Sequence, residues 1–150
     1  MIEDCGKSAT DADGTAPEHG GRMKATCQCG QLSVTAPGPS RLVIVCHCSY
    51  CQRRSGSPFG TLAYYPREKL TITGQASRFE RPTASGGITE TFFCPTCGST
   101  MYVRVGKQPA MLGIPVGAFA NPQYPAPMLS AWEQSKHDWV VIPELAERHA

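Results

Sequence analysis

Three cysteines lie close together in the segment VCHCSYCQRRSGS, which spans residues 45–57. They are Cys46, Cys48 and Cys51, and two arginines follow directly. A zinc ion with a structural role usually has four protein ligands, whereas a catalytic zinc has three and keeps one position open. The segment therefore contributes either part of a four-ligand site or a three-ligand site at which a reacting group could bind.

Two further pairs of cysteines each stand just before a glycine. Cys27 and Cys29 are one residue apart, and Cys94 and Cys97 are two residues apart. Such short spacings let both thiolates reach one metal ion about 2.3 Å away, and glycine tolerates the positive φ that turns the backbone beneath the metal. The four sulfurs form a complete tetrahedral set, so we expect one structural Zn²⁺ that closes a long loop of the chain.

With these four cysteines assigned together, the three of the central segment have no evident fourth ligand. If that segment ends a strand, Cys46 and Cys48 point one way and His47 the other, which favours His47 as a supporting or surface residue. Three thiolates leave bound Zn²⁺ with a net charge of −1, so a soft sulfur donor suits the open position better than an activated water. The sequence thus predicts a second Zn²⁺ that holds an incoming thiol as its thiolate.

Two alternatives to metal binding stay open for these cysteines. The chain has eight cysteines in 150 residues, and a disulfide scaffold or unrelated core cysteines would also account for such a number. The acidic, polar N-terminal segment has no apolar stretch typical of a secretory signal, so we expect a reducing, cytoplasmic setting that disfavours disulfides. Cys5 lies in that segment without a partner motif and is predicted to be a free thiol.

Short strands bounded by Gly and Pro dominate the rest of the chain and predict a mainly β fold of small antiparallel sheets with little helix. Residues 1–22 show no periodicity and are expected to form a mobile tail, followed by one domain over residues 23–150. One helical turn is expected at residues 143–150, and the two tryptophans, Trp132 and Trp139, are expected in the core. Strands are expected within 24–36 and at 41–45, 59–65, 69–73, 77–82, 88–93, 99–105, 110–116 and 128–134.

The order of these motifs resembles a known family. Over roughly residues 23–142 the chain has Cys-x-Cys-Gly, then Cys-His-Cys-x-x-Cys, then Phe-Cys-x-x-Cys-Gly and a late Lys-x-x-Trp. This pattern is similar to the glutathione-dependent formaldehyde-activating enzymes (GFA), a family that also includes centromere protein V. The resemblance implies a β-tent fold with two zinc ions. It assigns the structural zinc to Cys27, Cys29, Cys94 and Cys97 and the catalytic zinc to Cys46, Cys48 and Cys51.

The resemblance also implies an activity, that of a carbon–sulfur lyase acting on the adduct of glutathione and formaldehyde or on a related thiol adduct. Glutathione would then be a co-substrate, and Arg53 or Arg54 could orient one of its carboxylates. This chain has Ser130 where many relatives have a histidine, and His137 lies near it in sequence. The position bears on which substrate is used and on how a proton is transferred.

Composition limits the other classes of function. The formal net charge of +2, without a stripe of Lys and Arg, disfavours a nucleic acid as partner, and no apolar run reaches the length of a membrane span. A small thiol or thiol adduct is the expected partner, and the sequence predicts no particular oligomeric state. A non-catalytic zinc module that binds another macromolecule, and a redox or zinc-buffering role for the three central thiols, remain as alternatives.

Overall fold

The structure, a computed structural model, describes residues 21–83, 86–142 and 147–149. Short strands make up most of it, together with one short α-helix and three 3₁₀ turns. In chain order the elements are β1 (Met23–Thr26), β2 (Ser33–Ala36), β3 (Val43–Cys46), α1 (Ser49–Ser55), β4 (Gly60–Pro66), η1 (Arg67–Lys69), β5 (Thr71–Thr73), β6 (Ser77–Pro82), β7 (Ile88–Phe93), β8 (Thr100–Val105), β9 (Met111–Pro115), η2 (Val116–Phe119), β10 (Leu129–Ala131), η3 (Glu133–Ser135) and β11 (Glu147–His149).

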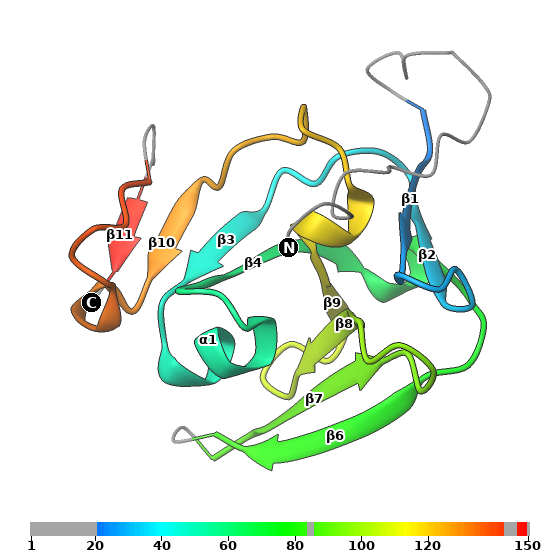
Figure 1. The fold of residues 1–150 in the computed structure, drawn as a ribbon, viewed down its shortest axis with the longest axis horizontal. Coiled ribbons are helices and arrows are strands. Elements are labelled where there is room, and N and C mark those ends of the chain that lie inside the picture. The colour runs from blue at the N-terminus through cyan, green and yellow to red at the C-terminus, as the bar shows by residue number, and fades with distance from the viewer. Residues whose placement is uncertain (1–20, 84–85, 143–146, 150) are drawn as a thin grey trace, which may run out of the picture.

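The strands form two sheets. A three-stranded sheet has the order β1-β2-β5, and an eight-stranded sheet has the order β11-β10-β3-β4-β9-β8-β7-β6. Figure 1 shows that the larger sheet bends, so that β6 and β7 lie below α1 while β3 and β4 lie above it in this view. The mainly β prediction and its β-tent arrangement of short sheets are confirmed, and α1 lies on the concave side of the larger sheet.

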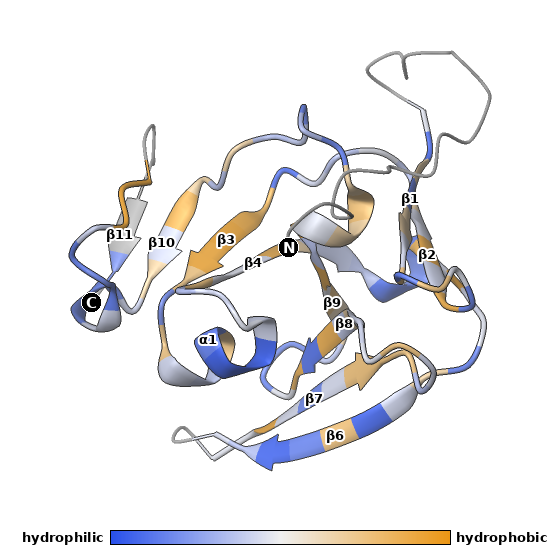
Figure 2. Ribbon diagram, viewed as in Figure 1, coloured by the Kyte–Doolittle hydropathy of each residue, from blue (hydrophilic) through white to orange (hydrophobic). Residues whose placement is uncertain are grey.

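The main core lies on the other side of the larger sheet, where strands of both sheets contribute apolar side chains. Val34 of β2, Ala63 and Tyr65 of β4 and Ile114 of β9 all belong to one buried cluster. Figure 2 shows the same division, with apolar residues along β3 and β9 and mostly polar residues on α1. Because side chains alternate along a strand, the odd-numbered residues of β4 face this core, and the even-numbered residues of β4 face α1.

The predicted strands are present, but their pairing is not antiparallel throughout. Strand β10 runs parallel to β3, because the long connection through η2 returns the chain to the end of the sheet where β3 begins. The helical turn expected at 143–150 is wrong where it can be checked. Residues 147–149 form β11, which pairs in parallel with β10, and residues 143–146 and 150 lie outside the described residues. The main-chain hydrogen bonds to β10 therefore replace those of a terminal helix.

Both tryptophans lie at the surface of the fold. Trp132 and Trp139 are 50% and 70% exposed, so the prediction that they lie in the core was wrong. Ser130 and Val140 take the buried positions beside them. The expected tail at residues 1–22, which includes Cys5, lies outside the described residues except for its last two. Among the helices of the described residues, none has the length and apolar character needed to cross a membrane.

Candidate metal centres

Four of the predicted ligands come together between the two sheets. Cys27 and Cys29 follow β1, Cys94 and Cys97 follow β7, and the four Sγ atoms all lie within 4.8 Å of one another. We call them the outer cluster. The Sγ atom of Cys29 is 3.6 Å from those of both Cys27 and Cys94. This separation is far longer than a disulfide bond and close to the roughly 3.8 Å edge of a tetrahedron of sulfurs placed 2.3 Å from a zinc ion.

Hydrogen bonds from the backbone and from side chains surround the outer cluster. The Leu32 N–H and the Gln31 side-chain amide donate to the sulfurs of Cys27 and Cys94, each over 3.2 Å. The Ser99 hydroxyl lies 3.3 Å from the sulfur of Cys97, and hydrogen bonding with Ser99 is the main reason why the pKa of this thiol falls to about 5. Donors aimed at sulfur stabilise thiolates, so this donor set suits a divalent metal ion.

A glycine directly follows the second cysteine in each of the two turns of the outer cluster. Gly30 and Gly98 adopt positive φ angles of 81° and 75°, and each donates its N–H to the carbonyl group of the first cysteine of its turn. The turns belong to different sheets, since one joins β1 to β2 and the other joins β7 to β8. A metal ion bound by the outer cluster would therefore tie the small sheet to the large one.

The other three predicted ligands come together at the junction of β3 and α1. Cys46 ends β3, Cys48 is the N-cap of α1, and the Sγ atoms of Cys46, Cys48 and Cys51 all lie within 4.8 Å of one another. We call them the inner cluster. The sulfur of Cys48 accepts a hydrogen bond from the Cys51 N–H over 3.4 Å, so a thiol takes the place of the usual capping hydroxyl or carboxylate. All three cysteines are half-buried.

Arg54 packs between the inner cluster and β4. Gly60 pairs with Cys46 across β3 and β4, and a Cβ atom on Gly60 would lie 2.5 Å from Nη2 of Arg54 and 3.2 Å from Cβ of Cys51. The pKa of Cys51 falls to about 6, because the Cys46 thiol hydrogen-bonds to it and the Arg54 charge lies beside it, against the opposing effect of burial. The hydrogen bond from Cys46 correspondingly raises the pKa of the Cys46 thiol. Arg54 thus favours a thiolate at Cys51.

A comparison with protein families agrees with this double cluster. Residues 22–135 match the sequence profile of the family described as glutathione-dependent formaldehyde-activating enzyme. The matched segment is well over half of the chain and includes all seven clustered cysteines. The chain belongs to this family.

The GFA relatives are distant and longer. A Fusarium vanettenii protein is 27% identical over 101 residues, which are 67% of this chain and 54% of that protein. A Penicillium rubens protein is 25% identical over 126 residues, which are 79% of this chain and 65% of that protein. Both bear the family's enzyme name only provisionally. The chain therefore spans between about half and two thirds of the length of these relatives.

A solved structure shares the fold. A crystal structure of a Rhodobacter sphaeroides protein superposes with a TM-score of 0.51 and covers 85% of this chain and 100% of its own. The two sequences are 19% identical, so the likeness concerns the fold alone.

In this GFA chain, His47 and Ser130 lie together behind the inner cluster. His47 is fully buried, and its Nε2 lies 3.1 Å from the hydroxyl of Ser130, which in turn donates to Glu133. His47 directly follows β3 and donates its N–H to the carbonyl group of Ala131, so continued strand alternation would place its side chain on the opposite face from that of Cys46. Ser130, which stands where the resemblance expects a histidine, therefore forms a hydrogen bond with His47 in this protein. His137 is instead hydrogen-bonded to Gln52 of α1.

Two residues near the inner cluster were not identified from the sequence. The guanidinium carbon of Arg81, on β6, lies 3.8 Å from the centre of the Tyr50 ring. Tyr50 itself lies between Cys48 and Cys51 in the first turn of α1. Tyr64, on β4, is close enough to the cluster that, after burial, the charges of Cys51 and Cys46 contribute to raising its pKa to about 12. No sequence motif includes either residue. Pairing of strands across the larger sheet, rather than proximity in the sequence, brings them near the cluster. Arg53, in contrast, is exposed on α1.

Proposed function

We propose that this protein is a zinc-dependent carbon–sulfur lyase that interconverts a thiol and formaldehyde with their S-hydroxymethyl adduct, and that the thiol is glutathione. The observation that carries the proposal is the inner cluster. Among the described residues, its three sulfurs have no fourth Cys, His, Asp or Glu ligand within the same distance, whereas the outer cluster is complete. Three protein ligands with one open position are typical of a catalytic zinc.

The residues present fit such a metal. Cys46, Cys48 and Cys51 would hold the ion, and a zinc ion bound there would supply a position at which an incoming thiol loses its proton and stays nucleophilic. The chain itself contributes charge and orientation. Arg54 offsets part of the negative charge of three thiolates, and the backbone N–H of Cys51 fixes the sulfur of Cys48 at the start of α1.

The carboxylates of a peptide-like thiol need cationic partners near the inner cluster. Arg53 and Arg54 are the candidates expected from the sequence for this contact, and their positions favour Arg53. Arg54 lies against Cys51 and Gly60, whereas Arg53 is exposed one helical turn from Tyr50. Arg81 stacks on the same Tyr50, and among the described residues it forms no ion pair. Arg53 and Arg81 are therefore the two guanidinium groups best placed to bind a carboxylate of the thiol.

The other proposed properties follow from the same assignment. The expected partner is a small thiol rather than a nucleic acid or a membrane, and the expected location is the cytoplasm, where glutathione is abundant and thiols stay reduced. The expected cofactor is zinc, with two ions per chain, one at each cluster.

The experiment is NMR exchange spectroscopy of ¹³C-formaldehyde with glutathione, with and without the full chain purified with its metals. We expect the protein to accelerate exchange between free formaldehyde and S-hydroxymethylglutathione well above the rate without protein. A thiol without carboxylates, such as 2-mercaptoethanol, is the control, and its exchange with formaldehyde should be accelerated less. Protein that holds two metal ions per chain and accelerates neither exchange would contradict the proposal and favour a non-catalytic zinc module.

A further inference from the structure

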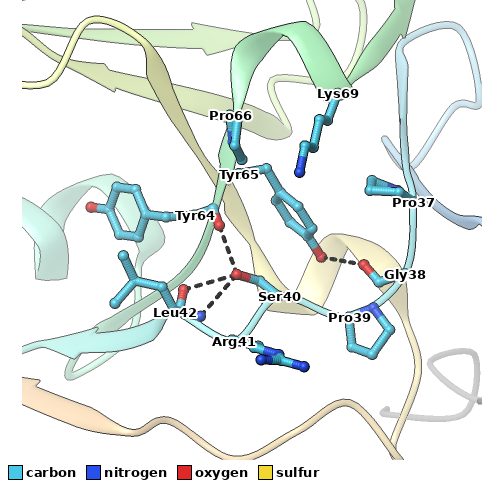
Figure 3. A pocket seen from close by; sticks show the side chains of 10 residues that line it. All are labelled: Pro37, Gly38, Pro39, Ser40, Arg41, Leu42, Tyr64, Tyr65, Pro66 and Lys69. Carbon is cyan, nitrogen blue, oxygen red and sulfur yellow. Dashed lines mark hydrogen bonds between the residues drawn. The ribbon is translucent and has the colours of Figure 1, made fainter. Parts of the chain in front are cut away.

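Tyr64 and Tyr65 are neighbours on β4 that point to opposite faces of the larger sheet. Tyr65 lies in the main core, where its hydroxyl donates to the carbonyl group of Gly38 and hydrogen-bonds with the hydroxyl of Tyr124. Figure 3 shows that Tyr65 points into the hollow between β4 and the segment around Gly38, while the ring of Tyr64 points away from it on the other side of β4. The Tyr64 side chain therefore lies on the face that carries α1.

Strand register relates this face to the inner cluster. Cys46 pairs with Gly60, and residues two and four positions further along β4 point the same way as Gly60. Leu62 and Tyr64 thus follow the inner cluster along one face, and Leu62 is buried without belonging to the main core. Tyr64 therefore lies on the same face of β4 as Gly60, four residues further along the strand from the partner of Cys46.

The Tyr64 ring is closely packed while its hydroxyl is unused by the protein. Gly113 is its partner across β4 and β9, and a Cβ atom on Gly113 would lie 3.1 Å from Cε1 and 3.2 Å from Cζ of the ring. Among the hydrogen bonds of the described residues, none involves the Tyr64 hydroxyl, whereas the Tyr65 hydroxyl has two. Tyr64 thus offers a closely packed phenol, with a donor that the described residues leave unused, on the face of β4 that carries the inner cluster.

We propose that Tyr64 is a catalytic residue whose hydroxyl donates a hydrogen bond to the aldehyde-derived oxygen of the thiol adduct. The proposal rests on the proposed function, since it requires that the sulfur of the adduct lies at the inner cluster. An S-hydroxymethyl group has one carbon between its sulfur and its oxygen, so the oxygen extends only a short way from the thiols. A tyrosine phenol, whose ordinary pKa is about 10, is protonated at neutral pH, as a donor must be.

The role follows from how charge moves in the reaction. In adduct formation the sulfur lone pair forms the C–S bond, and the π electron pair of the C=O bond moves to the oxygen. The thiol has lost one proton to solvent and the oxygen takes one up, so that protons balance and nothing is oxidised or reduced. In the reverse direction the O–H proton leaves, the C=O bond re-forms and the C–S bond breaks with its electron pair on sulfur. Negative charge develops on oxygen both ways, and a fixed donor stabilises it.

The test compares Tyr64→Phe with Tyr65→Phe in the full, metal-loaded chain. We expect Tyr64→Phe to lower kcat for glutathione–formaldehyde exchange by about 100-fold, the usual effect of removing one oxyanion donor. KM, metal content and thermal unfolding should stay close to wild type. Tyr65→Phe should show the reverse, a lower Tm from the lost buried hydrogen bonds and a nearly unchanged kcat. Equal kcat in Tyr64→Phe and wild type, or a loss confined to KM, would overturn the role of Tyr64.

A spectroscopic measurement separates contact with the oxygen from a packing effect. With tyrosines labelled with ¹³C at Cζ, the signal missing in Tyr64→Phe identifies Tyr64. It should shift when glutathione and formaldehyde are added together but not with glutathione alone, and the Tyr65 signal should stay in place. A wild-type protein that accelerates exchange while the Tyr64 signal does not move would refute this inference alone. A wild-type protein that does not accelerate exchange would refute both the proposed function and the inference.

Discussion

The two cysteine clusters are built from the same ligand type but differ in what surrounds them. The outer cluster takes its cysteines from turns of two different sheets and has four sulfurs, with hydrogen-bond donors from Leu32, Gln31 and Ser99 directed at them. The inner cluster takes three sulfurs from the end of one strand and the first turn of one helix. The first site joins parts of the fold that are distant in sequence, and the second joins parts that are already adjacent.

The number of ligands and their separation along the chain together indicate the role of a metal site. A metal ion at the outer cluster would close a loop of some 65 residues, which constrains the unfolded chain strongly. A metal ion at the inner cluster would span six residues, and local hydrogen bonds already hold them. We therefore propose that the outer cluster provides stability and the inner one the chemistry, and variants of the two clusters should separate these roles.

The largest effect is expected from Cys94→Ser in the outer cluster. Binding of a structural zinc contributes about 10 kcal/mol or more to folding, which is comparable to the whole stability of a typical domain, about 5–15 kcal/mol. We expect the variant to lose the fold, as followed by circular dichroism and by soluble yield. A Cys94→Ser protein that unfolds at the wild-type temperature would show that the outer cluster does not stabilise the fold.

The matched change in the inner cluster, Cys46→Ser, should spare the fold and remove the activity. We expect one metal ion fewer per chain by elemental analysis, a Tm within a few degrees of wild type, and loss of thiol–aldehyde exchange. The reason is that β3 and α1 keep their hydrogen bonds to β4 and β10 without the Cys46 sulfur. Unfolding as severe as that of Cys94→Ser would abolish the distinction between the clusters.

Gly60→Ala should produce a moderate effect confined to the inner cluster. The added methyl group would lie 2.5 Å from the Nη2 atom of Arg54, a flexible end that can turn away, and 3.2 Å from the Cβ atom of Cys51, which only a shift of α1 can relieve. Such overpacking costs about 1–3 kcal/mol, which urea denaturation can measure. Gly117→Ala is the control, because its Cβ would meet nothing within 4 Å, and equal losses in both variants would argue against close packing at Gly60.

The smallest expected effect concerns pH. Arg54 contributes to lowering the pKa of Cys51 to about 6, so Arg54→Met should raise that pKa and let protons compete better with a metal ion. We expect metal retention by the inner cluster to require a higher pH, as measured by competition with a chromogenic chelator between pH 5 and 8. Arg53→Met, which changes an exposed arginine one residue away, should leave the pH of half-maximal metal retention unchanged. A lower pH of half-maximal retention in Arg54→Met would contradict the assigned charge effect.

Which cysteines come together in each cluster could be predicted from sequence, whereas the surroundings of the clusters could not. Short Cys spacings and the following glycines are local features, and they sufficed to pair the outer four and to leave the inner three together. Helix α1 was missed because it has seven residues, no apolar stripe and a cysteine as its N-cap. Propensity rules contain no signal for a helix that starts on a thiol.

Which side chains reach the inner cluster depends on pairing between strands that are distant in sequence. The register of Cys46 with Gly60 decides that Tyr64 faces α1 and that Tyr65 faces the core, and one residue of slip would exchange them. The same holds for Arg81, which β6 brings over Tyr50. The average burial of tryptophan was a poor guide for Trp132 and Trp139, since Ser130 and Val140, near them in the chain, are buried instead.

The most direct measurement of the two roles is a chelator titration of the wild-type chain in which released metal and circular dichroism are followed together. We expect two steps. The first metal ion leaves while the β-sheet signal is unchanged and thiol–aldehyde exchange stops, and the second leaves together with the fold. Release of both ions in one step that coincides with unfolding, or loss of the fold with the first ion, would contradict the division between an inner reactive cluster and an outer structural one.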